Sequence, residues 1–403
     1  MNRISTSAIT NSVTVEKNDG TFFFSNIRAT IVLLVIFLHS ALAYSTVSDR
    51  WWILADPQKT VMADIIAGAL DIMLMSILFF IAGYFTLPSY TKCSSYQFLI
   101  KKLKNLMLPW LMSVLLLNPF LVNVIHYCNG NSNRSFLANT IVYYRNFLRV
   151  PLKIIQDRSE SPFFFSHYHV WFLSLLFFFF IGFIVFRMIS TRIKLRNMEA
   201  HSTGRFTTDV IALITLSSLG YFMFHAFFED KWFVVSVVQF QVSRIVPYLV
   251  FFIFGIRSYE KGWLNKISCF RFPIISLFSA TGFTLMYLTF YAYVNSSKSI
   301  VLCLMFSFLR YLLCTWYLLV FLRIGQKYFC RKTKFNIILT RNSFNVYIIH
   351  LNVTILFTLI FKGEAWLAPE LKMILVFTFT AFSSYLITLF YDKIRNVKYL
   401  KKA

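Results

Sequence analysis

Long runs of apolar residues dominate this chain and limit what it can fold into. Ile31–Leu38, Ser174–Phe186 and Ile245–Ile256 contain almost no polar side chains, and 58% of all residues are hydrophobic whereas only 14% are charged. Such runs require lipid as their solvent, which excludes the soluble, disordered, collagenous and disulfide-scaffold classes. Because unsatisfied backbone groups cannot lie in hydrocarbon, each run is expected to be helical. The sequence therefore predicts an all-α polytopic membrane protein.

About ten segments have the length and apolar character of a transmembrane helix. The first begins about 25 residues into the chain, and no small-residue cleavage site follows it, so we expect it to stay in the protein. The chain then divides into a disordered cytoplasmic tail (1–24), a membrane domain (25–391) and a basic cytoplasmic tail (392–403). The predicted spans are 26–46, 66–88, 106–126, 163–186, 209–228, 233–256, 273–293, 300–323, 337–361 and 371–391.

Positive charge is distributed unevenly between the loops. The chain has 40 Lys and Arg against 16 Asp and Glu, a formal net charge of +24. With a cytoplasmic N-terminus, 25 of the basic residues fall on the inner side and 10 in outer loops, as the positive-inside rule requires. We therefore expect both termini in the cytoplasm and no nucleic-acid partner. The outer loop 127–162 is long and basic, which favours an anionic or glycan acceptor.

The cysteines predict neither a disulfide nor a metal site. Of the six, only Cys128 is expected on the outer side, so no outer pair exists to form a structural disulfide. No pair has the spacing of a zinc site.

Arg28 and His39 place two ionisable groups in the first span. Such groups are costly inside a membrane and are candidates for function. Eleven residues correspond to about 1100°, close to three full turns, so the two side chains share one helix face. We expect Arg28 at the inner surface and His39 near the midplane. The alternative is an arginine that extends to the interface and a histidine that bonds a neighbouring helix.

Ser343, Tyr347 and His350 repeat this pattern in the ninth span. Their i, i+4, i+7 spacing puts them on one face that is entered from the cytoplasm. We assign them to donor binding. The alternative is that they form polar contacts between helices.

Three further charges, those of Asp71, Arg244 and Arg310, lie within predicted spans. An ion pair between Asp71 and one arginine is the plain explanation for part of this set. Two unpaired guanidinium groups would instead attract a phosphate, a carboxylate or a thioester oxygen.

Polar residues also gather at the two predicted membrane surfaces. The outer group is assigned to the acceptor side, although His and Trp are also ordinary residues of a membrane interface. The inner group precedes Pro109 and is assigned to donor phosphates, although such a cluster also serves topology. The outer residues are His169, Trp171, Glu229 and Asp230, and the inner residues are Lys101, Lys102 and Lys104.

These motifs occur together in one order, and with them the chain resembles the membrane-bound acyltransferase 3 family over about residues 25–391. The family moves acyl groups from cytosolic donors to extracytoplasmic sugars. The motifs are R-x10-H (Arg28, His39), F-I-A-G-Y-F (Phe80–Phe85), basic residues before Pro109 (Lys101, Lys104), H-V-W-F-L (His169–Leu173) and N-S-F-N-V-Y-I-I-H (Asn342–His350).

The resemblance implies a role for each matching residue. His39 would be the essential histidine, acting as a base on the acceptor hydroxyl or as an acyl relay, and Arg28 would hold the donor or orient that histidine. Two positions depart from the family pattern. Its arginine pair before the proline is matched by Lys102 and Asn105, and its aspartate three residues before the first-span arginine is Ser25.

The resemblance predicts an O-acyltransferase of the bacterial inner membrane. The donor would be acetyl-CoA or succinyl-CoA, used as a co-substrate with no permanently bound cofactor, and the acceptor an extracytoplasmic glycan. The F-S-N-I-R-A start resembles the branch that succinylates periplasmic glucans. Two alternatives stay open: a transporter or exporter, because buried His, Arg and Asp also mark ion pathways, and a family member without catalytic activity.

Overall fold

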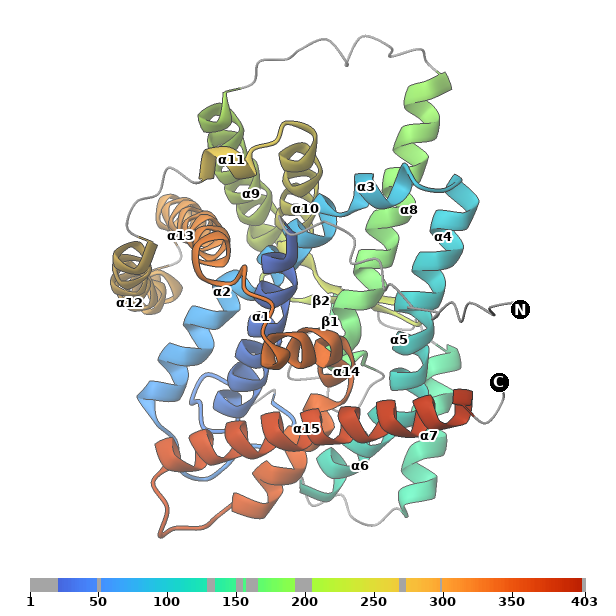
Figure 1. Ribbon diagram of the computed structural model, residues 1–403. Coiled ribbons are helices and arrows are strands. Elements are labelled where there is room, and N and C mark those ends of the chain that lie inside the picture. The colour runs from blue at the N-terminus through green and yellow to red at the C-terminus, as the bar shows by residue number, and fades with distance from the viewer. Residues whose placement is uncertain are drawn as a thin grey trace, which may run out of the picture.

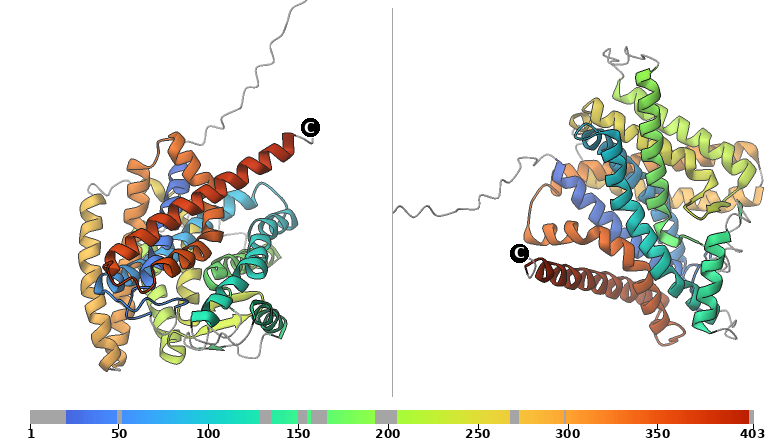
Figure 2. Two further views of the ribbon diagram at one scale, coloured as in Figure 1. Left: turned by 90° about the horizontal axis from the view of Figure 1, so that it is seen from below. Right: turned by 90° about the vertical axis from the view of Figure 1, so that its right-hand side faces the viewer.

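The computed structural model describes residues 21–48, 52–128, 135–149, 155–156, 166–192, 205–267, 273–297 and 299–400. Within these residues, nine helical segments are long and apolar enough to cross a membrane. The predicted class, an all-α polytopic membrane protein, is therefore confirmed. The helices form one bundle, with α12 (Pro273–Ser297) and α15 (Pro369–Leu400) on its outside (Figures 1 and 2).

Most predicted spans match a helix to within a few residues. The seventh corresponds to α12, whose described apolar stretch, Ile274–Phe290, is shorter than the others. The last helix continues to Leu400, into the predicted tail 392–403, while residues 1–20 and 401–403 lie outside the described part. The other helices are α1 (Phe22–Leu42), α2 (Val61–Tyr84), α3 (Thr86–Tyr90), α4 (Ser95–Lys102), α5 (Leu108–Met112), α6 (Asn118–Cys128), α7 (Phe136–Arg149), α8 (Trp171–Arg192), α9 (Phe206–Phe228), α10 (Ile245–Glu260), α11 (Leu264–Ile267), α13 (Ile300–Tyr328) and α14 (Lys334–Phe361).

The predicted sixth span, 233–256, is wrong in its first half. Strands β2 (Trp232–Val235) and β3 (Val238–Gln241) form an antiparallel hairpin there, and β1 (Ile155–Gln156) pairs with β2. Side chains along both strands alternate between buried and half-buried, which is the period of a strand and not of a helix. A single 3-10 turn then leads into α10, so the helical part of this segment starts later than its hydropathy suggests.

The third span, α4 to α6, contains two π-helical turns, Leu103–Met107 and Ser113–Leu117, on either side of Pro109. A proline lacks the backbone N–H of a helix, and π turns free backbone carbonyls that need other partners. In the second turn these partners come from outside the helix, and they fix α7 and α14 against it. Tyr143 and Tyr144 donate to the carbonyls of Val114 and Leu115, and Asn352 donates to that of Leu117.

Helices α2 and α10 pack so closely that their backbones are in direct contact. A Cβ added at Gly83 would lie 2.0 Å from the Phe252 carbonyl oxygen, and one at Gly255 would lie 2.1 Å from the Phe80 carbonyl oxygen. Small residues permit this close approach between helices in a membrane. Gly83 belongs to the F-I-A-G-Y-F motif, so this part of the motif serves helix packing.

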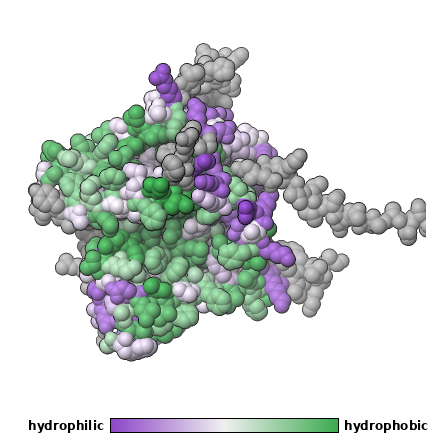
Figure 3. Space-filling view, turned by 60° about the vertical axis from the view of Figure 1, so that its left-hand side comes forward, coloured by the Kyte–Doolittle hydropathy of each residue, from purple (hydrophilic) through white to green (hydrophobic). Residues whose placement is uncertain are grey.

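The surface of the bundle is suited to lipid. On the face shown in Figure 3, apolar side chains form one broad area, and hydrophilic side chains gather along its right side and at its lower left. Exposed large apolar residues of α12, α13 and α15 contribute to the lipid-facing surface; they include Phe278, Met305 and Phe382.

We predict that Gly83→Ala disrupts the α2–α10 contact. The added methyl group meets backbone rather than a flexible side chain, so the helices must separate, and overpacking of this kind costs about 1–3 kcal/mol. The purified variant should show a lower melting temperature in detergent. Gly182→Ala is the matched control, because a Cβ there meets nothing within 4 Å. Equal melting temperatures for the two variants would contradict this account of the packing.

Candidate active site

One large cavity of about 1180 Å³ connects several of the candidate residues. Its walls come from α1, α2, α9, α10, α13 and α14, from the loop after α1, from the turn before α8 and from the hairpin. On α2 the lining residues are Asp64, Ala67, Gly68, Asp71 and Met75, which share one helix face. His39, His169, Trp171 and Tyr347 line the same cavity.

His39 and His350 form a direct pair between α1 and α14. The distance from His39 Nδ1 to His350 Nε2 is 2.9 Å, and the two rings are parallel. His39 lies in the last turn of α1, because this helix ends at Leu42 and not at 46. It is therefore nearer the C-terminal end of α1 than the middle of the helix, where the sequence predicted it. His350 is fully buried.

The hydrogen bonds of His350 assign the protons of this pair. His350 Nδ1 lies 2.7 Å from the Tyr347 carbonyl oxygen, which can only accept, so Nδ1 carries the proton. Burial disfavours a charged ring, and in a neutral ring Nε2 is then the acceptor. The proton between the two histidines therefore belongs to His39 Nδ1. This leaves the lone pair of His39 on Nε2, the nitrogen suited to act as a base.

His169 packs against the same pair. Its Nε2 donates to the Ile348 carbonyl oxygen at 2.9 Å, and its ring meets the His350 ring edge-on. Tyr347 donates its hydroxyl to the His169 carbonyl oxygen at 2.5 Å. Tyr168, the residue before His169, has a φ of 48°, in the left-handed region that non-glycine residues rarely adopt. This backbone conformation is held by hydrogen bonds on both sides.

His167, just before Tyr168, is fully buried and holds the start of this turn in place. Its Nε2 lies 3.2 Å from the carbonyl oxygens of Val235 and Ser236 in the hairpin, and its Nδ1 accepts from Trp110 Nε1 at 3.2 Å. Burial lowers the pKa of His167 to about 3, so the ring is neutral at physiological pH. His167 therefore positions the turn that carries His169.

The loop between α1 and α2 brings an aromatic ring to His39. The Trp52 ring stacks on the His39 ring with centroids 5.3 Å apart. An ion pair anchors this loop: Asp56 lies 3.3 Å from Lys372 Nζ of α15, and both side chains are fully buried. Asp56 also accepts from the Gly363 backbone N–H at 3.2 Å. The position of Trp52 thus depends on a contact with the last helix.

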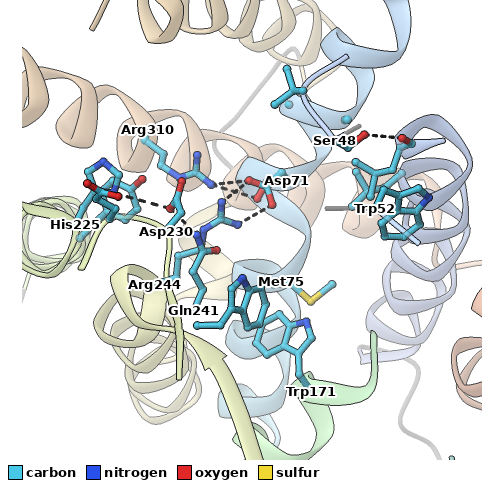
Figure 4. Close-up of a pocket in the computed structure, with 18 of the residues that line it drawn as sticks. Ser48, Trp52, Asp71, Met75, Trp171, His225, Asp230, Gln241, Arg244 and Arg310 are labelled. Carbon is cyan, nitrogen blue, oxygen red and sulfur yellow. Dashed lines mark hydrogen bonds and ion pairs between the residues drawn. The ribbon is translucent and has the colours of Figure 1, made fainter. Parts of the chain in front are cut away.

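Asp71, Arg244 and Arg310 form one cluster at the cavity (Figure 4). Arg244 binds both carboxylate oxygens of Asp71 at 2.6 Å, and Arg310 Nη2 lies 3.1 Å from one of them. Arg310 also donates to the Tyr287 hydroxyl at 2.9 Å. Both arginines therefore pair with the same carboxylate, and the alternative of two unpaired guanidinium groups is wrong.

The other residues assigned to the acceptor side lie at the same cavity. Trp171 contacts Trp232 of the hairpin and Tyr248 of α10 through its ring. Asp230 accepts from Gln241 Nε2 at 2.5 Å. Glu229 is exposed and has a φ of 52°, where α9 ends.

The residues assigned to the donor do not form one group. Arg28 is exposed and donates to Ser25 Oγ at 3.4 Å, at the position where the family has an aspartate. Lys102 places its ammonium 4.1 Å from the ring centroid of Phe180 in α8. Ser343 is buried and donates to a carbonyl of its own helix. Lys101 and Lys104 are exposed, whereas Tyr347 and His350 lie at the His39 pair.

Sequence reasoning missed several residues of the site. Trp52, Asp56 and Lys372 were not assigned a role. A lysine in the first turn of an apolar helix is a recognisable signal, but its partner 316 residues away is not visible in the sequence. In the described ranges, no group of three or more His, Cys, Asp or Glu side chains is placed to hold a metal ion.

The fold and the site define a multi-pass membrane protein with a histidine pair at a large polar cavity. The model of the acyltransferase 3 family, an acyltransferase domain, matches residues 22–392, and the chain belongs to this family. No curated protein and no solved structure matches the chain.

We predict that Lys372→Met destabilises the protein. Removing one partner of a buried ion pair leaves an uncompensated charge and costs about 3–5 kcal/mol. The melting temperature in detergent should fall. The double variant Asp56→Asn/Lys372→Met removes both charges and should recover most of the loss. If the double variant melts below the single variant, the pair does not act in this way.

Proposed function

We propose that this membrane acyltransferase moves an acetyl or succinyl group from a cytosolic acyl-CoA to a hydroxyl group of an extracytoplasmic carbohydrate, in the bacterial inner membrane. Membership of the acyltransferase 3 family supports the reaction class. The observation that carries the proposal is the hydrogen bond between His39 and His350 at the cavity, which fixes the proton on His39 Nδ1.

His39 Nε2 acts as the general base in this proposal. It removes the proton of the acceptor hydroxyl while the oxygen attacks the thioester carbon. A C–O bond forms, the C–S bond breaks, and the proton passes from His39 to the thiolate of the leaving coenzyme. When His39 is protonated, its Nδ1–H bond to His350 Nε2 becomes charge-assisted and stronger. His350 is thus a positioning residue that sets the tautomer of His39.

The walls of the cavity are suited to a sugar. Trp52, Trp171 and Trp232 supply flat apolar rings, while Asp71, Gln239 and other polar groups supply hydrogen-bonding partners. A sugar presents both apolar C–H faces and hydroxyl groups, so it needs both kinds of contact.

We assign donor binding to basic residues that lie away from the cavity, near the start of α1 and of the third span. Arg28, Lys101 and Lys104 are exposed, so each can reach a phosphate of the coenzyme. The pantetheine arm of the coenzyme would then extend toward His39. No permanently bound cofactor is needed for this chemistry.

We predict that His39→Ala abolishes acyl transfer and leaves the protein folded. His39 is half-buried beside the cavity, so its removal opens space without breaking a core. His350→Ala keeps the base but frees its tautomer, and the expected loss is roughly 10²–10⁴-fold in kcat. The measurement is transfer of radiolabelled acyl groups from acyl-CoA to membrane glycans, with melting temperatures as the check on folding.

Thr358→Ala provides a matched control on the same helix, because Thr358 is buried and bonds only a carbonyl of α14 among the contacts described. Full acyl transfer by His39→Ala would refute the mechanism. Solute uptake by proteoliposomes that contain no acyl donor would support the transporter alternative instead.

A further inference from the structure

The carboxylate of Asp71 is exposed at the cavity, whereas the two arginines that hold it are more deeply buried. The Asp71 side chain is 38% exposed, and those of Arg244 and Arg310 are 12% and 8% exposed. All three residues line the cavity, and Figure 4 shows both guanidinium groups converging on the carboxylate. Of the three charges, the carboxylate of Asp71 therefore has the largest exposed fraction and is open to contact by a ligand in the cavity.

A second ion pair in the same protein shows what a purely structural pair looks like. Asp56 and Lys372 are both fully buried, so neither can contact a ligand. Arg244 alone already donates to both oxygens of Asp71, and each oxygen has a second lone pair. The additional contact from Arg310 is not needed for a pair, and it further favours the ionised carboxylate. The cluster thus presents an ionised acceptor to the cavity in one fixed orientation.

We propose that Asp71 binds hydroxyl groups of an uncharged acceptor sugar. An ionised carboxylate only accepts hydrogen bonds, and the hydroxyl groups of a sugar are suitable donors. Tyr221, Tyr248 and Tyr287 surround this cluster and are almost completely buried, so they support it rather than bind the sugar. That the bound sugar is the acceptor of acyl transfer rests on the proposed function.

The other charges of the cavity select against an anionic sugar. Asp230, with its side chain 45% exposed, and Glu229, which is also exposed, lie at the same cavity as Asp71. Asp230 is held by Gln241 and Ser243, lies 3.8 Å from His225 Nδ1, and forms no ion pair with either arginine among the described contacts. A carboxylate or phosphate on the sugar would approach these like charges, and the repulsion would weaken its binding. The basic loop 127–162 predicts an anionic or a glycan acceptor. Of these two, the charges of the cavity favour a neutral glycan.

The test measures sugar binding by the purified protein in nanodiscs, without acyl donor. The probes are three neutral hexasaccharides, maltohexaose, cellohexaose and laminarihexaose, and the anionic hexagalacturonate. Because Trp52 and Trp171 line the cavity, tryptophan fluorescence reports occupancy. At least one neutral probe should bind, and hexagalacturonate should bind at least tenfold more weakly. Binding of hexagalacturonate as tight as that of the neutral probes, or no binding of any probe, would overturn the proposal.

Asp71→Asn should weaken binding of the neutral probe at least tenfold. Asp209→Asn is the matched control, because Asp209 also pairs with two cations, Arg257 and Lys261, but does not line the cavity. Equal effects of the two substitutions would overturn the role of Asp71.

A measurement on the unmodified protein covers the case in which Asp71→Asn does not fold. Cys303 lines the cavity, so a bound sugar should shield it from a maleimide, as read by mass spectrometry of its peptide. Neutral hexasaccharides should slow this labelling, and hexagalacturonate should not. Sugar binding without acyl transfer would refute the proposed function alone, and acyl transfer to an anionic glycan would refute this inference alone.

Discussion

Polar groups inside a bilayer must be satisfied within the protein, and this constraint shapes most of the bundle. The π turn Ser113–Leu117 releases carbonyls that take donors from two tyrosines of α7 and from Asn352 of α14. Asp56 is buried only because Lys372 is buried with it. These contacts join elements that are far apart in the sequence, so the bonds that satisfy the backbone and the buried charges also fix the helices around the cavity.

The same constraint determines which histidine of the pair donates the hydrogen bond. The Tyr347 carbonyl can only accept, so it orders the protons along the chain from Tyr347 through His350 to His39. The hydrogen bond that His350 makes within α14 thereby determines the tautomer of His39 on α1, and leaves the lone pair of His39 on Nε2. The pair therefore explains how a buried polar contact, which the sequence also allowed as simple helix pairing, can serve a reaction.

Hydropathy predicted the spans because long apolar helices are specified by composition alone. It failed at 233–256 because the hairpin is also rich in aromatic and β-branched residues, and hydropathy does not separate a strand from a helix. Helical spacing correctly grouped Tyr347 with His350, but it does not show which helix they face, and the two lie at His39. Trp52 could not be found because a loop has no period that would place its ring.

The departures from the family pattern would have physical consequences for the proposed binding of the donor. Where the family has the first arginine of its pair, Lys102 places its ammonium on the rings of Phe98 and Phe180, a contact that stabilises α4 against α8. A lysine held in this way is less available to a phosphate, and lysine lacks the planar fork that binds phosphate through two bonds. Lys101 and Lys104 remain exposed beside it. In this chain, phosphate attraction at this surface would therefore rest on single point charges, which set proximity to the donor more than its orientation.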